Sequence, residues 1–212
     1  LITGQALRPV AVMVVLTALI IYVNAPWLLA LLFFRGAFTV KMLAALTKVV
    51  PPLLLGMVPM CIIVVWLRAW YAQRAYATVC IVALIVCVLY PAGAGFFGLS
   101  GGATGIAWSY ATTWWAVFLT VLMVIEGPAV SMRLFPPGFA AKLLLLTLAI
   151  LIIGRKAYGV LTPYVDLASP PTLALGVFLT AALMLSTAIA IGGCLGLSPE
   201  IDTITRKGLT KK

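Results

Sequence analysis

Residues 10–34 read VAVMVVLTALIIYVNAPWLLALLFF, a stretch of 25 residues without one charged side chain. A helix that crosses the hydrocarbon core of a bilayer needs about 20 mostly apolar residues, so this stretch alone predicts a transmembrane helix. Five more apolar blocks follow, at residues 49–67, 75–90, 104–125, 139–153 and 172–197. The pattern predicts an all-α, polytopic membrane protein, a helical bundle of about six transmembrane helices.

The composition of the whole chain supports the same fold class. Hydrophobic residues make up 65% of the 212 residues and charged residues only 8%, and the mean hydropathy is +1.23. In soluble domains about 25% of residues are charged. The fifth block is the weakest, because it is short, contains Lys142 and follows Pro136 and Pro137. It spans the membrane only if the Lys142 side chain reaches one interface.

The 14 lysines and arginines fall unequally on the two sides of the predicted membrane. Nine are expected on the side of the two termini: Arg8, Arg68, Arg74, Arg133, Lys142, Arg206, Lys207, Lys211 and Lys212. Five are expected on the opposite side: Arg35, Lys41, Lys48, Arg155 and Lys156. Because cytoplasmic loops collect positive charge, both termini are predicted to be cytoplasmic. No basic surface with interleaved aromatic residues lies outside the membrane, so nucleic acid is not expected as a partner.

The residue inventory argues against catalysis and metal binding. The chain has no histidine, and its four acids, Glu126, Asp166, Glu200 and Asp202, stand apart near span ends or in loops. No paired carboxylates, nucleophile and base pair or metal-ligand cluster is therefore expected. The prediction is a protein that is not an enzyme, without catalytic residues, cofactor or metal site.

Three glycines, Gly93, Gly95 and Gly98, match the spacing GxGxxG of dinucleotide-binding loops. That fingerprint needs a preceding strand, a helix packed on a soluble sheet and an acid about 20 residues further on. Here the glycines follow a hydrophobic helix, so a nucleotide site is rejected. They are expected to form a flexible loop at the outer surface, where the third and fourth spans turn back.

Four cations next to the membrane are the candidate substrate-binding residues: Arg35, Lys48, Arg68 and Arg74. A cation inside the membrane is a functional candidate by default, and Lys48 comes just before Pro51 and Pro52. The simpler alternative is that Lys48 reaches the outer headgroups, that Arg35 anchors the first helix, and that Arg68 and Arg74 are interfacial anchors next to aromatic residues.

The second and fourth blocks carry features of their own. Prolines 51, 52 and 59 remove backbone donors, so the second helix is expected to be bent or broken and to line a cavity. In the fourth block small polar residues alternate with tryptophans, and the small residues are expected to pack against neighbouring helices. They are Thr104, Gly105, Ser109, Thr112 and Thr113.

Several segments, in this order, resemble the C-terminal part of the MurJ/MviN-type lipid II flippases of the multidrug/oligosaccharidyl-lipid/polysaccharide exporter superfamily. Residues 6–38 begin with Ala-Leu-Arg-Pro, continue with a long apolar span and end with Leu-Leu-Phe-Phe-Arg-Gly-Ala-Phe. They are similar to the family's ninth helix and the loop that follows it. The Arg-Gly-Ala-Phe run is the most specific piece. Residues 70–74, Trp-Tyr-Ala-Gln-Arg, and residues 101–108 look like two later family segments.

The resemblance implies the last six of fourteen helices, in a bacterial cytoplasmic membrane. Residues 1–126 would be the four-helix part of the C-terminal transport lobe. Residues 127–212 would be two additional transmembrane helices, which form a groove for the lipid tail, and a basic cytoplasmic tail. Lipid II would be moved by alternating access, with membrane lipids and a missing N-terminal half or partner subunit as the other partners. No sodium site is implied, since the third block from Val79 to Leu89 is apolar.

Two other functions remain open from the sequence. An exporter of another polyprenyl-linked saccharide in the same superfamily would have the same helices and differ only in its cargo. A noncatalytic membrane scaffold subunit would also fit the shortage of buried charge. Such a scaffold should not respond to Lys48→Ala or Arg35→Ala, whereas a flippase should.

Overall fold

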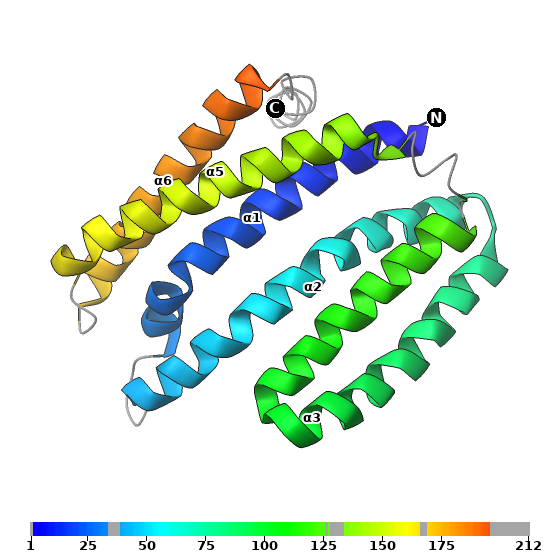
Figure 1. Ribbon diagram of the computed structural model, residues 1–212, viewed down its shortest axis with the longest axis horizontal. Helices are drawn as coiled ribbons and strands as arrows, with labels where there is room; N and C mark the ends of the chain where they lie inside the picture. Colours follow the sequence, from blue (N-terminus) through cyan, green and yellow to red (C-terminus); the bar gives the residue numbers. More distant parts are fainter. Residues whose placement is uncertain (1, 34–38, 126, 128–133, 166–168, 196–212) are drawn as a thin grey trace. The chain divides into compact units, whose positions relative to one another are not determined.

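The computed structural model describes residues 2–33, 39–125, 127, 134–165 and 169–195, and these residues contain helices and no strand. The elements are α1 (Ile2–Phe33), α2 (Val40–Ala72), α3 (Tyr76–Thr120), the π-helical turn η1 (Val121–Ile125), α5 (Pro137–Leu161), the 3-10 turn η2 (Thr162–Tyr164) and α6 (Pro170–Cys194) (Figure 1). Five helices are long and apolar enough to cross a membrane. The predicted fold class, an all-α membrane bundle, is confirmed.

Helix α3 is 45 residues long and folds back on itself. A straight helix of that length would extend about 68 Å, more than twice the roughly 30 Å of the hydrocarbon core. Gly102 interrupts the helix with φ 54° and ψ −136°. The Ser109 hydroxyl donates to the carbonyl of Tyr90, 19 residues earlier, at 3.2 Å. The two arms, residues 76–101 and 103–120, therefore run side by side (Figure 1), and with the other four helices they supply the six predicted apolar spans.

The reversal in α3 lies later in the chain than the sequence predicts. The expected loop at Gly93, Gly95 and Gly98 is wrong, because these residues are helical and the chain turns at Gly102. A backbone with φ of 54° and ψ of −136° is readily adopted only by a residue without Cβ. Gly93 instead allows close contact between the arms, since a Cβ there would lie 2.6 Å from the Ser109 hydroxyl oxygen.

The second arm of α3 packs through its small residues. Gly105 is buried, and the side chains of Ser109 and Thr113 are 0% and 4% exposed. Trp108 remains 45% exposed. The expectation that small polar residues of this span face neighbouring helices is confirmed for these three positions, whereas Thr112 is exposed.

Helix α2 is continuous through its prolines. The sequence favours a bent or broken helix at Pro51, Pro52 and Pro59, but α2 runs without a break from Val40 to Ala72. Gly56 has a packing role in this helix, because a Cβ there would lie 2.7 Å from Tyr110 Cδ1 and 2.8 Å from the Cα of Ala111 on α3. The expected break is therefore absent from α2, and Gly56 lets the second arm of α3 approach this helix closely.

A tryptophan compensates for one of the α2 prolines. Pro59 has no N–H, so the carbonyl of Leu55, four residues earlier, lacks its usual helical donor. The indole Nε1 of Trp115 donates to this carbonyl at 3.1 Å. An unpaired carbonyl costs several kcal/mol in a bilayer because water is absent there. The second arm of α3 therefore supplies the hydrogen bond that the proline removes from α2.

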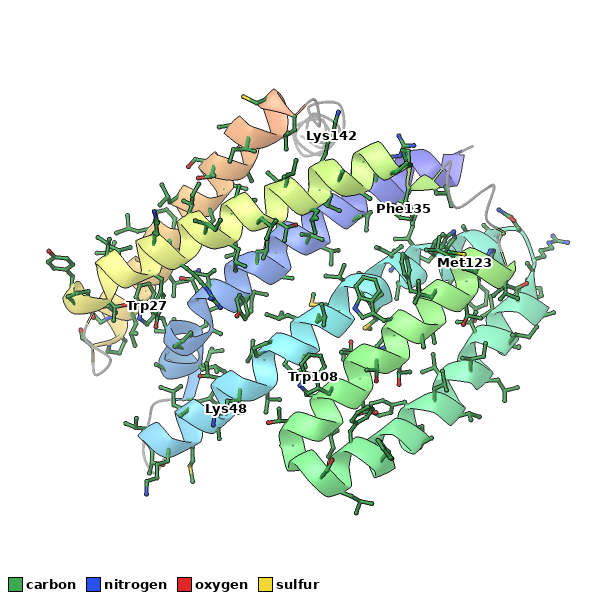
Figure 2. The ribbon with its side chains drawn as sticks, viewed as in Figure 1. Trp27, Lys48, Trp108, Met123, Phe135 and Lys142 are labelled. Atoms are coloured by element: carbon green, nitrogen blue, oxygen red, sulfur yellow. The ribbon has the colours of Figure 1, made fainter. Side chains whose placement is uncertain are left out.

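Helix α5 is longer than the fifth apolar block. It begins with Pro137, a favoured residue in the first helical position, and continues past Arg155 and Lys156 to Leu161. Its 25 residues extend about 38 Å. This length is enough to cross the hydrocarbon core of a bilayer. Lys142 is half-buried near the start of the helix (Figure 2).

Contacts divide the described residues into two compact units. One unit contains those of residues 1–14 and 51–139, and the other those of residues 15–50 and 140–195. The first has a core built on Leu7, Trp66, Trp70, Val117 and Phe118, among others. The second contains a cluster of Trp27, Ala30, Leu43 and Leu173, which draws side chains from α1, α2 and α6.

Candidate functional site

Lys48 and Arg68 stand at opposite ends of the apolar part of α2. They are separated by about 30 Å along the helix axis, since each residue adds about 1.5 Å, and this equals the thickness of the hydrocarbon core. Both side chains are exposed, and Lys48 lies near the start of α2 (Figure 2). This spacing lets both cations reach headgroups, one in each leaflet.

Arg74 closes the turn between α2 and α3. The N–H of Ala75 donates to the Trp70 carbonyl at 2.9 Å, and the N–H of Arg74 donates to the Tyr71 carbonyl at 3.1 Å. These are the two hydrogen bonds of a Schellman motif, whose left-handed position is usually glycine. Here that position is Arg74, with φ 58°. A non-glycine residue in this conformation is uncommon and costs roughly 1–2 kcal/mol, so the exposed Arg74 side chain occupies a position where glycine would be more stable.

The three candidate cations that the structure describes are placed at two ends of α2. Arg68 and Arg74 lie together at the end of α2, with the aromatic rings of Tyr71 and Tyr76, whose centroids are 6.2 Å apart, beside them. Lys48 lies at the other end of α2. Arg35 lies outside the described residues.

Arg8 has a structural role at the same end of the first unit as Arg68 and Arg74. Its Nε donates to the carbonyl of Leu134 at 3.0 Å, and its guanidinium carbon lies 5.8 Å from the centre of the Phe139 ring. The neighbouring Leu7 packs into the core with Trp66 and Trp70. Arg8 thus fixes the segment before α5 to the start of α1.

A buried polar pair, Asn24 and Thr180, was not predicted. Both side chains are 0% exposed. The Thr180 hydroxyl contacts the Asn24 side-chain oxygen and also lies 2.9 Å from the carbonyl of Gly176, while the Asn24 amide donates to the Ile20 carbonyl at 2.9 Å. The sequence held a signal, because Asn24 is the sole asparagine of the chain and interrupts the uncharged stretch of residues 10–34. The pair joins α1 to α6.

We predict that Thr180→Val destabilises the protein, whereas Thr147→Val does not. Thr147 also bonds the carbonyl four residues earlier, that of Leu143, at 2.7 Å, so the two changes remove the same local bond. Only Thr180 also contacts a side chain of another helix. Such bonds contribute about 0.6 kcal/mol on average, with a maximum near 1.7 kcal/mol, in membrane proteins. Equilibrium unfolding in mixed micelles measures the difference, and equal midpoints for the two variants would contradict it.

A second polar contact joins α1 to α5. Nη2 of Arg155 donates to the hydroxyl of Tyr22 at 2.7 Å, and its guanidinium carbon lies 5.6 Å from the centre of the same ring. One turn further along α5, Tyr158 packs on Trp27 with ring centroids 4.3 Å apart. Arg155 was expected only as one of the five cations of the outer side, because its pairing with Tyr22 depends on which faces of α1 and α5 meet.

Comparison with protein families decides what this bundle is. A family model described as lipid II flippase MurJ matches residues 1–165. The chain belongs to this family. No curated protein and no solved structure matches the chain.

Membership of the lipid II flippase MurJ family gives the function. The protein is a multi-pass membrane transport protein that moves lipid II in peptidoglycan synthesis. The resemblance seen in the sequence is confirmed as to family. The match covers α1 to α5 and all four candidate cations, whereas α6 lies beyond it.

The chemistry of the cargo of a lipid II flippase fits cations at helix ends. A polyprenyl diphosphate has an anionic head and an apolar tail, and guanidinium groups bind phosphate oxygens through paired donors. Arg68 and Arg74 offer two such groups at one end of α2, and both are exposed. All four acids of the chain lie outside the described residues, so the described surface carries only positive formal charges.

Proposed function

We propose that this chain is the C-terminal part of a lipid II flippase that works by alternating access. Residues 1–126 would form the four-helix part of its transport lobe. Residues 127–212 would add α5 and α6 as a groove for the polyprenyl tail, followed by a basic tail. The family match supports the cargo, and the remaining helices would come from an N-terminal half or a partner subunit.

The double proline of α2 supports a mechanism with a moving part. Both compact units include part of α2, and the boundary between them falls between Val50 and Pro51. Pro51 and Pro52 remove the helical donors for the carbonyls of Thr47 and Lys48. A helix bends most easily where its hydrogen-bond ladder is interrupted, so we place the flexing point of α2 here.

The cation distribution supports an orientation in the bacterial cytoplasmic membrane. The topology predicted from the sequence assigns Arg8, Arg68 and Arg74 to one side and Lys41, Lys48 and Arg155 to the other, as part of its division into nine and five cations. The positive-inside rule then gives cytoplasmic termini. On this orientation Arg68 and Arg74 would meet lipid II where it enters, and Lys48 would lie where it leaves. Transport of this kind needs no covalent step, so the protein is not an enzyme.

Arg74→Gly tests the proposal, because its effects on stability and on transport should have opposite signs. Glycine suits the left-handed position, so the free energy of unfolding should rise by about 1 kcal/mol. Loss of a headgroup contact worth about 1 kcal/mol should lower the rate of lipid II flipping roughly fivefold. The assay follows a fluorescent lipid II analogue in proteoliposomes containing this chain together with the proposed N-terminal half or partner subunit.

One control variant and one further candidate variant complete the test. Lys142→Gln removes a charge on the same proposed side, outside the candidate set, and should leave the flipping rate unchanged. Lys48→Gln should lower the rate as Arg74→Gly does. If Arg74→Gly and Lys48→Gln flip lipid II at the wild-type rate, these cations do not contact the cargo, and a scaffold role gains support.

A further inference from the structure

Arg155 lies too deep along α5 to be an ordinary interfacial anchor. Lys142 and Arg155 are about 20 Å apart along the helix axis, whereas the hydrocarbon core is about 30 Å thick. On α2 the cations Lys48 and Arg68 are about 30 Å apart and fit the bilayer. The two cations of α5 cannot both be level with headgroups without reaching outward by several ångströms.

The direction of the two side chains decides which of the two charges lies below the headgroups. In a helix the Cα–Cβ bond tilts toward the N-terminus. For Lys142 near the start of α5 this is the direction of the nearer membrane surface, so its ammonium reaches that surface easily. For Arg155, near the other end of α5, the same tilt points the side chain toward the bilayer centre. The charge of Arg155 is therefore held below the headgroups.

The contacts of Arg155 show that it does not turn back toward the surface. Trp27 and Tyr158 form an aromatic pair at this end of α1 and α5. Tyr22, the partner of Arg155, lies five residues before Trp27, and Arg155 lies three residues before Tyr158, so both are deeper than the aromatic pair. The Trp27 indole is 1% exposed and packs in the core of this unit, so the pair marks depth within the bundle rather than the level of the headgroups. Tyr22 holds the guanidinium about one turn closer to the bilayer centre than this pair.

The guanidinium retains donors for a ligand. It has five N–H groups, of which one is directed at the Tyr22 hydroxyl, and the Arg155 side chain is exposed at the surface of α5. Lys156, also exposed, adds a second cation next to it. The described residues contain no carboxylate that pairs with it. An intramembrane arginine of this kind is stable when an anion or water comes to it.

We propose that Arg155, positioned by Tyr22, binds the phosphate group of a lipid on the outward surface of α1 and α5. The phosphate is either that of an anionic phospholipid or that of a polyprenyl diphosphate. The planar fork of the guanidinium donates hydrogen bonds to two phosphate oxygens, and the lipid chains cover the apolar surface beside it. This site goes beyond the proposed function, since it does not depend on cytoplasmic entry or on alternating access.

The test is lipid retention by the protein purified in neutral detergent, measured by native mass spectrometry during titration. The probes are phosphatidylglycerol, undecaprenyl diphosphate, inorganic diphosphate and, as a zwitterionic control, phosphatidylcholine. Arg155→Gln should weaken retention of one anionic lipid about tenfold, which corresponds to roughly 1.4 kcal/mol. Tyr22→Phe should weaken it less, because it removes only the group that orients the guanidinium. Arg155→Lys keeps the charge without the fork and should fall between wild type and Arg155→Gln.

Two variants provide matched controls. Lys41→Gln removes an exposed cation from the same end of the second unit and should bind as wild type does. Asp166→Asn should also leave retention unchanged, which separates lipid binding from loss of an ion pair. Stronger retention of undecaprenyl diphosphate than of phosphatidylglycerol identifies the cargo as the source of the phosphate, and the reverse identifies a phospholipid. The proposal is overturned if Arg155→Gln retains the anionic lipid as wild type does, or if Lys41→Gln or Asp166→Asn loses as much retention as Arg155→Gln. It is also overturned if inorganic diphosphate is the only probe that binds.

Discussion

Gly105→Ala is expected to disrupt the hairpin of α3 and to lower the free energy of unfolding by at least about 3 kcal/mol. A Cβ at this position would lie 1.9 Å from the carbonyl oxygen of Phe97 and 2.7 Å from its carbonyl carbon. Both atoms belong to the backbone of the first arm, so no side-chain rotation relieves the overlap. The two arms must separate, and the contact between Ser109 and the Tyr90 carbonyl is lost with them.

Gly95→Ala is the matched control for this prediction. Gly95 lies in the first arm of the same helix, and a Cβ there meets nothing within 4 Å. Alanine is favoured over glycine inside a helix by roughly 0.5–1 kcal/mol, so this variant should be as stable as wild type or slightly more so. Unfolding in mixed micelles, followed by circular dichroism, measures both variants. Equal stability of Gly105→Ala and Gly95→Ala would show that the arms do not pack as described.

Trp115→Phe is expected to cost about 2 kcal/mol, a cost that depends on Pro59. The change removes the indole donor from the Leu55 carbonyl. Although Leu55 is 45% exposed in the bundle, a bilayer offers no water to replace the donor, so we expect a cost of about 2 kcal/mol. Pro59→Ala restores an N–H that donates to the same carbonyl within the helix. In the Pro59→Ala background, Trp115→Phe should therefore cost only the packing of the smaller ring.

A double-mutant cycle isolates this coupling. The free energies of unfolding of Trp115→Phe, Pro59→Ala and the double variant should show an interaction of about 1–2 kcal/mol. Trp114→Phe supplies the control, because Trp114 is half-buried on the same arm and should cost the same with or without Pro59. If the cost of Trp115→Phe is the same in both backgrounds, the indole does not compensate for the proline.

Individual helices show which features of the fold can be predicted from the sequence. The apolar blocks located the long apolar helices that the structure describes, because the length of an apolar run is a property of the chain itself. Their ends were less well placed, as α5 shows by continuing past Arg155 and Lys156, two residues that the hydropathy pattern assigns to a loop. The reversal of α3 was placed at Gly93, Gly95 and Gly98, since glycines in sequence do not show which one adopts a positive φ.

The candidate site likewise combines residues that the sequence indicates with features that only the structure shows. Lys48, Arg68 and Arg74 were found from charge next to apolar blocks, and the structure adds their spacing along α2 and the backbone conformation of Arg74. Asn24 and Thr180 were missed because one polar side chain in an apolar helix gives no indication of its partner. Arg155 was counted as a loop cation, since its depth becomes visible only when the length of α5 is known.

The sequence by itself determined the class of protein and the positions of its long apolar helices, and it predicts the side of the membrane on which each cation lies. These follow from the exclusion of charge from hydrocarbon, which acts on each segment separately. The tertiary structure alone decided that Gly102 makes the turn, that Trp115 serves the carbonyl freed by Pro59, and that Tyr22 holds Arg155. Each of these depends on which helix faces meet, and contacts between faces more than 50 residues apart in the chain are set by packing rather than by hydropathy.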